Sequence, residues 1–335
     1  MRLFRALVGS IFVFACVACT GGELQSDTDT LAAVEPLTGP YLGQQPPGVE
    51  PALFAPGVVS TGFQEFSINF SPTGDEVFFY ATGPTYTPRI ILHSRLEDGI
   101  WSNPREAAFS DPGRTDLYPF VTPDGNRLFF CSFRSSGGSG TRMEIWFVER
   151  TERGWSEPQK IDFGGDFGGL GTFPSVATNG NLYFNRILDS PSSAIYVSRF
   201  ENGRYHRPEN LGPAVNNQAG DHHPFIASDE SYLLFSSQRE EDSFGGSDLF
   251  ISLHQEDGTW SAAKNLGPKV NTSYGERSPF VTADGKYLFF SSSRPVADLL
   301  PDGPLNYEEI NRRLHSPGNG LQDIYWISTE AIQLP

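Results

Sequence analysis

Carboxylate side chains recur at one place in the sequence, just before a short apolar segment. Glu65, Asp116, Asp221 and Glu276 occupy this place, and Gly171 takes it once. Carboxylates that converge attract a cation or a basic peptide segment, and a suitably spaced pair can act as acid and base on a glycosidic bond. The alternative is that each carboxylate caps a neighbouring backbone turn. The choice depends on how the fold arranges them.

Two adjacent histidines, His222 and His223, directly follow one of these carboxylates, Asp221. A metal site needs three or four converging nitrogen, oxygen or sulfur ligands, and only this copy supplies histidines here. We therefore predict no metal site and no cofactor, and we expect the histidines to form a polar pair beside the carboxylates. Calcium bound by the recurring carboxylates is the alternative that the sequence leaves open.

Arginine and an acid form a second recurring combination, in which the acid begins the next apolar segment. The pairs are Arg134 with Glu144, Arg239 with Asp248, and Arg294 with Asp323. A bidentate guanidinium can tie two strands together where the pleat brings them close. We predict ion pairs within each repeat, because an element that recurs in every repeat usually stabilises that repeat; a ligand-binding role is the alternative.

Several classes of chemistry lack their sequence signals. There is no nucleophile elbow, no His-Glu-x-x-His motif and no phosphate-binding glycine loop. The formal net charge of −16 repels phosphate backbones, so nucleic acid is not an expected partner. Cys131 lies in an apolar run without a second cysteine in the folded part, which predicts a buried, unreactive thiol.

The candidate residues lie in a unit that occurs five times. Each copy contains an apolar strand, a turn and a second apolar strand: NFSPTGDEVFF, FVTPDGNRLFF, SVATNGNLYF, FIASDESYLLF and FVTADGKYLFF. The turn positions 74, 125, 180, 230 and 285 are 51, 55, 50 and 55 residues apart. A third strand and a second hairpin follow, so each copy supplies four strands, which at this period indicates a propeller blade. Glu230 stands where the other copies have glycine, at an expected cost of about 1 kcal/mol or a change of turn type.

The fifth copy ends without a fourth strand, and residues 51–54 resemble the segment that supplies this strand elsewhere. We predict that this segment pairs in the last blade and closes the ring. The expected fold is an all-β propeller of five four-stranded blades over residues 46–335; six blades would need one more copy. An insertion at residues 295–320 of the last copy is expected to carry a short helix, YEEINRRL, at residues 307–314.

The strings FVTADGKYLFFSSSR and GLQDIYWIS resemble the TolB-type, WD-like propeller repeats of bacterial envelope proteins, and the resemblance covers roughly residues 50–328. It implies a propeller and a place in the bacterial envelope. Its motifs are specific for the fold and say little about function, because such repeats occur in partner-binding proteins and also beside catalytic domains.

The first 19 residues are typical of a lipoprotein signal peptide, with Arg2 and Arg5 before an apolar run. Either Cys16 or Cys19 could accept the lipid; plain secretion is the alternative. No Asp follows either cysteine, which by resemblance to lipoprotein sorting rules indicates the outer membrane. Residues 20–45 are predicted to form a flexible tether.

Together these features predict a monomeric, non-catalytic binding or scaffolding lipoprotein of the cell envelope. One propeller face would bind a protein or glycan partner. The alternative is a polysaccharide hydrolase or lyase that uses two acids at the channel mouth, such as Asp116 and Asp221, as acid and base.

Overall fold

The computed structural model describes residues 36–335 apart from 87–88, 112, 114, 135–142, 166–169, 188–192, 218 and 297–305. The predicted signal peptide, both candidate lipid-acceptor cysteines and most of the predicted tether lie outside the described residues. None of the helices in the described ranges is long and apolar enough to cross a membrane.

Besides one separate two-stranded hairpin, the described chain forms five larger antiparallel sheets of four or five strands, in which strands consecutive in the chain are mostly neighbours. We number these sheets as blades 1 to 5. Blade 1 contains β2 (Gln64–Phe70), β3 (Glu76–Thr82), β4 (Arg89–Glu97) and β6 (Arg105–Glu106); blade 2 contains β7 (Asp116–Val121), β8 (Arg127–Ser132), β9 (Glu144–Thr151) and β11 (Gln159–Lys160); blade 3 contains β12 (Leu170–Val176), β13 (Leu182–Ile187), β14 (Ser193–Ser198) and β17 (Glu209–Asn210); blade 4 contains β18 (Asp221–Ile226), β19 (Tyr232–Ser237), β20 (Asp248–Leu253) and β21 (Lys264–Asn265); and blade 5 contains β22 (Glu276–Val281), β23 (Tyr287–Ser292), β24 (Asp323–Ser328) and β1 (Ala52–Leu53).

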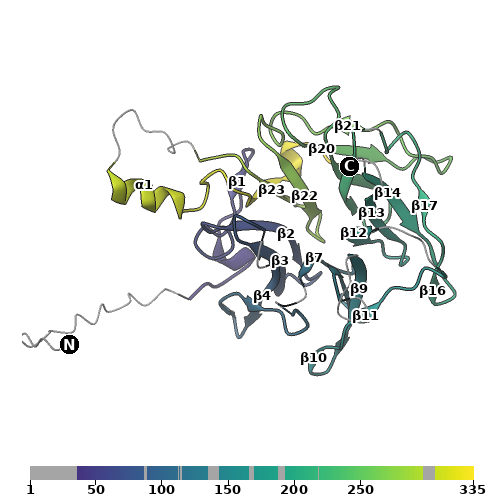
Figure 1. The fold of residues 1–335 in the computed structure, drawn as a ribbon, viewed down its shortest axis with the longest axis horizontal. Helices are drawn as coiled ribbons and strands as arrows, with labels where there is room; N and C mark the ends of the chain where they lie inside the picture. The colour runs from purple at the N-terminus through teal and green to yellow at the C-terminus, as the bar shows by residue number, and fades with distance from the viewer. Residues whose placement is uncertain are drawn as a thin grey trace, which may run out of the picture. The chain divides into compact units, whose positions relative to one another are not determined.

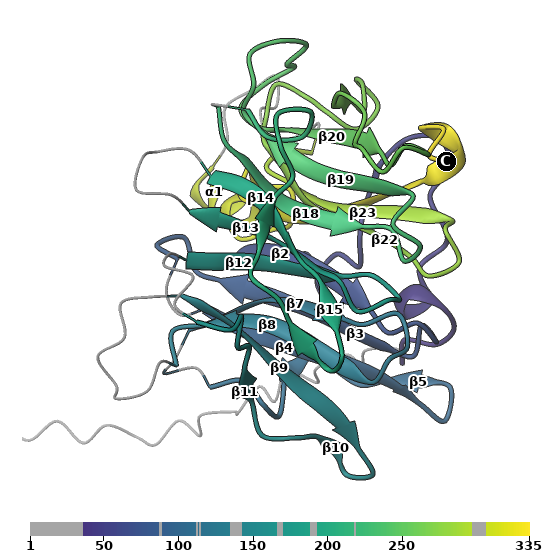
Figure 2. The same cartoon turned by 90° about the vertical axis from the view of Figure 1, so that its right-hand side faces the viewer.

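The first strands of the blades surround a central axis (Figure 1; Figure 2). Strand β2 contacts β7, β7 contacts β12, β12 contacts β18, β18 contacts β22, and β22 contacts β2 again. Because this series of contacts returns to its starting strand after five members, the described chain is a five-bladed β-propeller, as predicted.

An amino-terminal strand closes the ring. In β1, Ala52 lies opposite Trp326 and Leu53 lies opposite Tyr325 of β24. The next residue, Phe54, donates its backbone N–H to the carbonyl of Ile324 at 2.8 Å, and its ring is fully buried. The prediction that residues 51–54 complete the last blade is confirmed. Closure leaves the last blade without a long unpaired edge.

The folded part begins before residue 46, so the predicted boundary of the tether is wrong. Trp101 donates its indole N–H to the carbonyl of Gly39 at 2.7 Å, and its backbone N–H to that of Leu37 at 2.8 Å. The ring of Tyr41 packs against Trp326, with ring centroids 5.4 Å apart, and Leu42 is buried. These side chains pack in or against the main apolar core of the propeller, which a solvated tether would not do.

The fourth strand of each blade is short and lies beyond a separate hairpin. Hairpin strands β5 (Ile100–Trp101) and β10 (Gly154–Trp155) pair with the ends of β4 and β9, and β15 (Phe200–Glu201) pairs with β16 (Arg204–Tyr205). The aromatic residues Trp101, Trp155 and Tyr205 therefore lie in these hairpins and not in the fourth strands.

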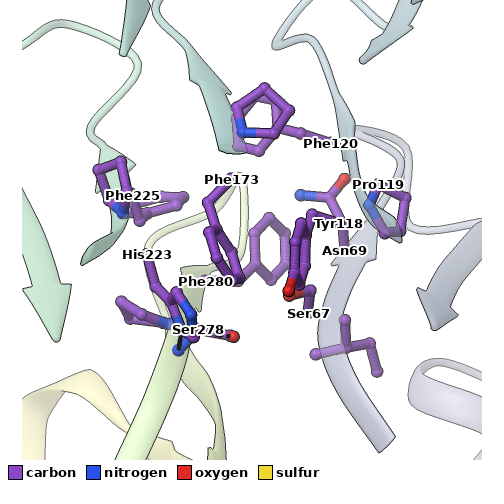
Figure 3. A pocket seen from close by; sticks show the side chains of 14 residues that line it. Ser67, Asn69, Tyr118, Pro119, Phe120, Phe173, His223, Phe225, Ser278 and Phe280 are labelled. Carbon is purple, nitrogen blue, oxygen red and sulfur yellow. Dashed lines mark hydrogen bonds between the residues drawn. The ribbon is translucent and has the colours of Figure 1, made fainter. Parts of the chain in front are cut away.

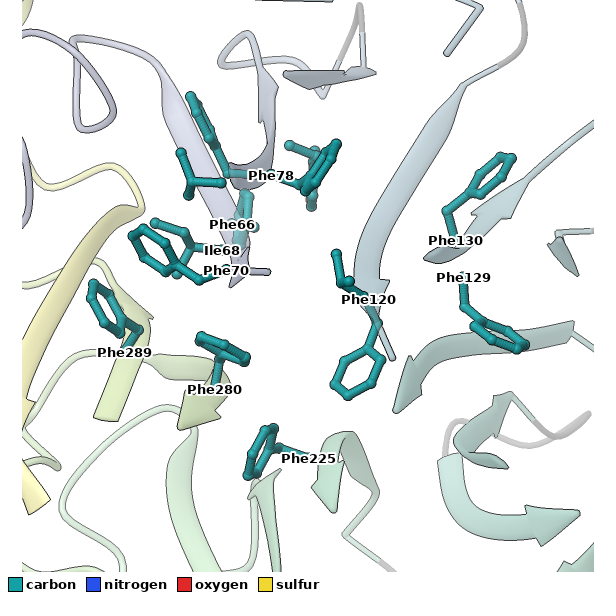
Figure 4. Close-up of a cluster of buried hydrophobic side chains, with 14 of the residues drawn as sticks. Phe66, Ile68, Phe70, Phe78, Phe120, Phe129, Phe130, Phe225, Phe280 and Phe289 are labelled. Carbon is teal, nitrogen blue, oxygen red and sulfur yellow. The ribbon is translucent and has the colours of Figure 1, made fainter. Parts of the chain in front are cut away.

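The core between the blades is largely aromatic. Phenylalanine side chains from first and second strands point between adjacent blades and toward the axis (Figure 4). Burying each such ring stabilises the fold by about 1.5–3 kcal/mol. The thiol of Cys131 belongs to this core, and burial raises its pKa, as expected for an unreactive cysteine.

The insertion in blade 5 contains α1 (Tyr307–Leu314), with the bounds that the sequence predicted. Asn306 caps it, because its side chain accepts the backbone N–H of Glu309 at 2.8 Å. Glu309 in turn forms ion pairs with Arg312 and Arg313, both at 2.6 Å. None of the eight helix residues is buried.

Candidate binding site in the central channel

Every first strand contains a bulge at the same position, and the bulged residue has a left-handed backbone conformation. The five residues with positive φ are Ser67 (50°), Tyr118 (57°), Phe173 (55°), His223 (54°) and Ser278 (52°). The pairing register between first and second strands shifts at each of them. Such a conformation costs a residue with a Cβ about 1–2 kcal/mol. Strain repeated at one place often marks a functional site, and these residues surround the channel.

The five bulged residues line a small chamber in the middle of the channel (Figure 3). Its volume is about 30 Å³, room for little more than one water molecule. The ring of Phe173 lies between those of Tyr118 and His223, with ring centroids 3.5 and 3.4 Å apart. These stacked side chains narrow the channel at this point.

Three phenylalanines separate this chamber from a wider hollow. Phe120, Phe225 and Phe280 line both spaces and are 7–8% exposed. Beyond them the channel opens into a cavity of about 440 Å³, on the side where the first strands turn into the second strands. We call this cavity the turn-side mouth. Its apolar lining also includes Phe70, Val121, Val176, Ile226, Val281 and Tyr232.

A second hollow lies between blades 2 and 3 on the same side. This blade 2–3 groove has a volume of about 530 Å³ and a mixed lining that includes Asn126, Arg127, Asn179, Phe200 and Tyr205. Three residues, Pro123, Val176 and Thr178, line both the groove and the turn-side mouth. The two hollows therefore adjoin.

The recurring carboxylates do not form an open ring at the channel mouth. Glu65, Asp116, Asp221 and Glu276 are at most 1% exposed. Each accepts the backbone N–H of a residue four or five positions earlier in the chain: Thr61 at 3.2 Å, Asp111 at 2.7 Å, Asn217 at 2.6 Å and Thr272 at 2.9 Å. The capping interpretation therefore describes these carboxylates, and they do not form a solvent-facing ring of ligand candidates at the channel mouth. The oxygens are used by local turns.

The recurring arginines pair with the first-strand acids, so the predicted partners are wrong. Their guanidinium groups lie 2.5, 2.6 and 3.2 Å from the carboxylates, in the pairs Arg134–Asp116, Arg239–Asp221 and Arg294–Glu276. The strand register explains the change. In each of these blades a serine of the second strand lies opposite the first-strand acid, and the arginine comes two residues after that serine in the chain. Each guanidinium also donates to a backbone carbonyl of the preceding loop, at Phe109, Val215 or Val270.

The predicted third-strand acids have other contacts. Glu144 lies 3.2 Å from the Lys160 ammonium group, and Asp248 accepts the side-chain amide of Asn265 at 2.8 Å. Asp323 accepts the backbone N–H of Gly318 at 2.9 Å. Because Arg294 is bound to Glu276, Asp323 has no cation beside it in the described residues, and burial raises its pKa to about 7.

Glu65 is likewise buried without an arginine, since blade 1 has Gly83 at the place of Arg134. Burial raises its pKa to about 8, although hydrogen bonds from Thr61 oppose the shift. Glu65 and Asp323 lie near each other, because the backbone N–H of Glu65 donates to the carbonyl of Gln322 at 2.7 Å. Both carboxyls therefore bind their protons at pH values where exposed carboxyls are ionised.

The predicted histidine pair lies at the channel, but in uncharged form. Burial, and then the charge of Arg277, lower the pKa of His222 to about 4. Burial also lowers the pKa of His223, whose Nδ1 accepts the backbone N–H of Ser278 at 3.2 Å. Within the described residues, no three His, Cys, Asp or Glu side chains are grouped closely enough to hold a metal ion.

No model of a known protein family matches the chain, and no curated protein matches it in sequence. Similar solved structures include a protein assigned to TolB from Agrobacterium tumefaciens (16% identity, TM-score 0.47, 79% of this chain and 90% of that one), TolB from Acinetobacter baumannii (12%, 0.44, 80% and 55%) and the GH43 endo-arabinanase from Bacillus licheniformis (14%, 0.47, 80% and 94%). We take no site or activity from these proteins. The five-bladed fold rests on this chain's own strand pairing.

Among the bulged residues that line the chamber, sequence reasoning singled out only His223. Tyr118, Phe173, His223 and Ser278 each precede a proline, and this repeated dipeptide was the available signal. Proline restricts the preceding residue, and it removes a backbone donor from the ladder, both of which favour a bulge. Arg277 was missed because it belongs to no recurring pattern.

Proposed function

We propose that this protein is a non-catalytic binding protein of the bacterial envelope, and that it binds an extended segment of a partner protein. The segment would lie across the turn-side mouth and the blade 2–3 groove. The observation that carries the proposal is that these hollows, of about 440 and 530 Å³, share three lining residues. Each has the volume of a typical ligand pocket.

The linings of the two hollows favour a protein segment over a glycan. The turn-side mouth combines phenylalanines that are almost covered with polar residues such as Asp229 and Thr282, and the phenylalanines suit an inserted apolar side chain. A sugar would instead need an exposed aromatic face on which to stack. The adjoining groove offers the amides of Asn126 and Asn179 and the Arg127–Glu149 ion pair, which suit polar atoms of an extended chain.

The environment of the recurring acids supports binding over catalysis. Asp116 and Asp221, proposed above as an acid and base pair, are fully buried and bound to arginines. A general acid or base must reach a proton on its substrate, and these carboxylates face their own blades. The acids that line the two hollows already have partners of their own: Asp124 accepts from Thr122 and Asn126, Glu149 pairs with Arg127, and Asp229 accepts from Ser231.

The envelope location is also part of the proposal. It is supported by the signal-like first 19 residues, with Cys16 or Cys19 as the lipid acceptor and the outer membrane as the destination. Metabolic labelling with a fatty acid tests it: we expect label in the wild type and its loss in either Cys16→Ser or Cys19→Ser. Equal labelling of both variants would contradict lipid attachment at these residues.

A space-filling substitution tests the binding site. Ala283 lines the turn-side mouth and is exposed, so Ala283→Trp should fill the mouth without disturbing the core. Ala262, an exposed alanine outside both hollows, provides the matched control Ala262→Trp. We expect Ala283→Trp to reduce capture of envelope proteins by roughly tenfold or more, and the control to leave it unchanged. Equal capture by the two variants would contradict the proposal.

A further inference from the structure

The opposite end of the channel contains an arginine for which the described part of the chain supplies no acceptor at Nε. Arg277 lies on β22 beside the bulged Ser278, toward the start of the first strand, and it is only partly exposed. Its Nε is buried without a hydrogen-bond partner, and within the described ranges none of its nitrogens forms an ion pair. A half-buried guanidinium without an acceptor loses hydration and gains nothing in return.

Nearby acids do not neutralise this charge. The adjacent Glu276 is bound to Arg294, to the Ser292 hydroxyl at 2.7 Å and to Thr272 at 2.9 Å. Arg277 directly precedes Ser278, which lines the chamber and donates its backbone N–H to His223 at 3.2 Å. Besides burial, the charge of Arg277 lowers the pKa values of His222 and His223, and it acts on Tyr118, as does that of Arg89. This end of the channel is therefore positive, although the chain as a whole has a formal charge of −16.

The neighbouring polar groups can donate hydrogen bonds. Because the Nδ1 of His223 accepts from the backbone N–H of Ser278, the neutral ring holds its proton on Nε2. Burial raises the pKa of Tyr118, so its hydroxyl keeps its proton. Donors around a positive charge select an acceptor that is itself negative.

We propose that this loop-side end of the channel binds a carboxylate group. Arg277 supplies the charge, and the Tyr118 hydroxyl and the His223 imidazole donate hydrogen bonds. The chamber of about 30 Å³ admits the tip of a ligand and excludes a ring. The ligand is therefore a small free acid or a peptide that ends in its own carboxylate. This site lies beyond the Phe120, Phe225 and Phe280 constriction from the turn-side mouth, so it is independent of the proposed function.

Imidazole NMR signals provide the direct test. The protein has six histidines, so the signals of His222 and His223 can be resolved and assigned. We expect acetate or triglycine to shift the His223 signal saturably, and the C-terminal amide of triglycine to bind at least tenfold more weakly. Binding of both acids indicates that any small carboxylate suffices, whereas binding of triglycine alone indicates a peptide terminus. No saturable shift with either acid, or equal binding of the amide, would overturn the proposal.

Variants assign the role to Arg277. Arg277→Gln should weaken binding roughly tenfold to a hundredfold, because a charge-assisted hydrogen bond is lost. Arg312→Gln, on the exposed helix α1, is the matched control and should bind as the wild type does. If Arg277→Gln does not fold, Tyr118→Phe removes a single hydroxyl and should weaken binding severalfold. Unchanged affinity in a folded variant of either residue would contradict its assigned role.

Discussion

At the turn of blade 4, a single residue compensates for its own strain. Glu230 has a φ of 61° at the place where the other four repeats have glycine. Its carboxylate accepts hydrogen bonds from the Tyr183 hydroxyl at 2.7 Å, Asn181 Nδ2 at 2.9 Å and Asn179 Nδ2 at 2.7 Å. The residue that breaks the turn pattern therefore joins blade 4 to blade 3. Its expected cost of about 1 kcal/mol is offset by contacts that only a long acceptor can make.

This balance predicts the sign of a substitution. Glu230→Gly relieves the backbone strain but leaves three donors without their acceptor, so we expect a net loss of about 1–3 kcal/mol in the free energy of unfolding. Glu230→Gln keeps one acceptor oxygen and should lose less. Urea unfolding measures both variants. A glycine variant as stable as the wild type would show that the interblade contacts contribute nothing.

At the scale of the elements, an arginine in the loop after the second strand binds an acid of the first strand in blades 2, 4 and 5. In blade 4, Arg239 donates to Asp221 at 2.6 Å and to the carbonyl of Val215 at 2.9 Å, and Asp221 is fully buried. One guanidinium thus connects the second strand, the first strand and the loop between blades 3 and 4. The same arrangement in blades 2 and 5 makes it a device of the repeat.

Removing this arginine should be costly because it leaves a buried carboxylate unpaired. We expect Arg239→Met to lower the free energy of unfolding by about 3–5 kcal/mol. Adding Asp221→Asn should recover part of that loss, because the buried charge is then removed as well. Arg95→Met breaks an exposed pair with Glu97 and should change stability by less than about 1 kcal/mol. A loss for Arg239→Met no larger than that of Arg95→Met would contradict the assignment.

On the scale of the whole molecule, the two unpaired carboxyls near the ring closure make stability depend on pH. The pKa values of Glu65 and Asp323 are raised to about 8 and about 7, from 4.5 and 3.8. At pH values between the unfolded and the folded pKa of each carboxyl, the folded protein still binds a proton that the unfolded chain has released. The free energy of unfolding is therefore greatest at the acidic end of this pH range. Below that window the opposite effect begins, because hydrogen bonds from His93 and Arg150 outweigh burial and lower the pKa of Glu76 to about 2.

We therefore expect the free energy of unfolding to fall as the pH rises from about 5 to 8, by up to about 1.4 kcal/mol per pH unit for each carboxyl. Asp323→Asn keeps an acceptor for the Gly318 N–H and should roughly halve this slope. The exposed Glu256→Gln is the control and should leave the slope unchanged. Thermal unfolding measured across this pH range gives the slope of stability against pH for each variant. An unaltered slope in Asp323→Asn would contradict the raised pKa of Asp323.

The repeats in the sequence predicted the strand pairs and turns from which the blades are built. Five turn-marked strand pairs indicated the blades, the unpaired fifth copy indicated the strand at residues 51–54, and the segment YEEINRRL in the insertion indicated α1. Side-chain direction was not predictable in this way, because the bulges at Tyr118 and its equivalents change the alternation along each first strand. A ring of acids at the channel mouth was accordingly left open beside the capping interpretation, and the arginines were paired with the wrong strand.

The central claim is that a partner protein binds at the turn-side mouth, and site-specific photo-cross-linking in intact cells tests it most directly. A photoreactive phenylalanine analogue would replace Ala283 at the mouth, Ala262 outside both hollows, or Tyr307 on α1. We predict a discrete cross-linked partner from position 283 and none from positions 262 and 307. Cross-linking from position 307 with none from position 283 would contradict the account.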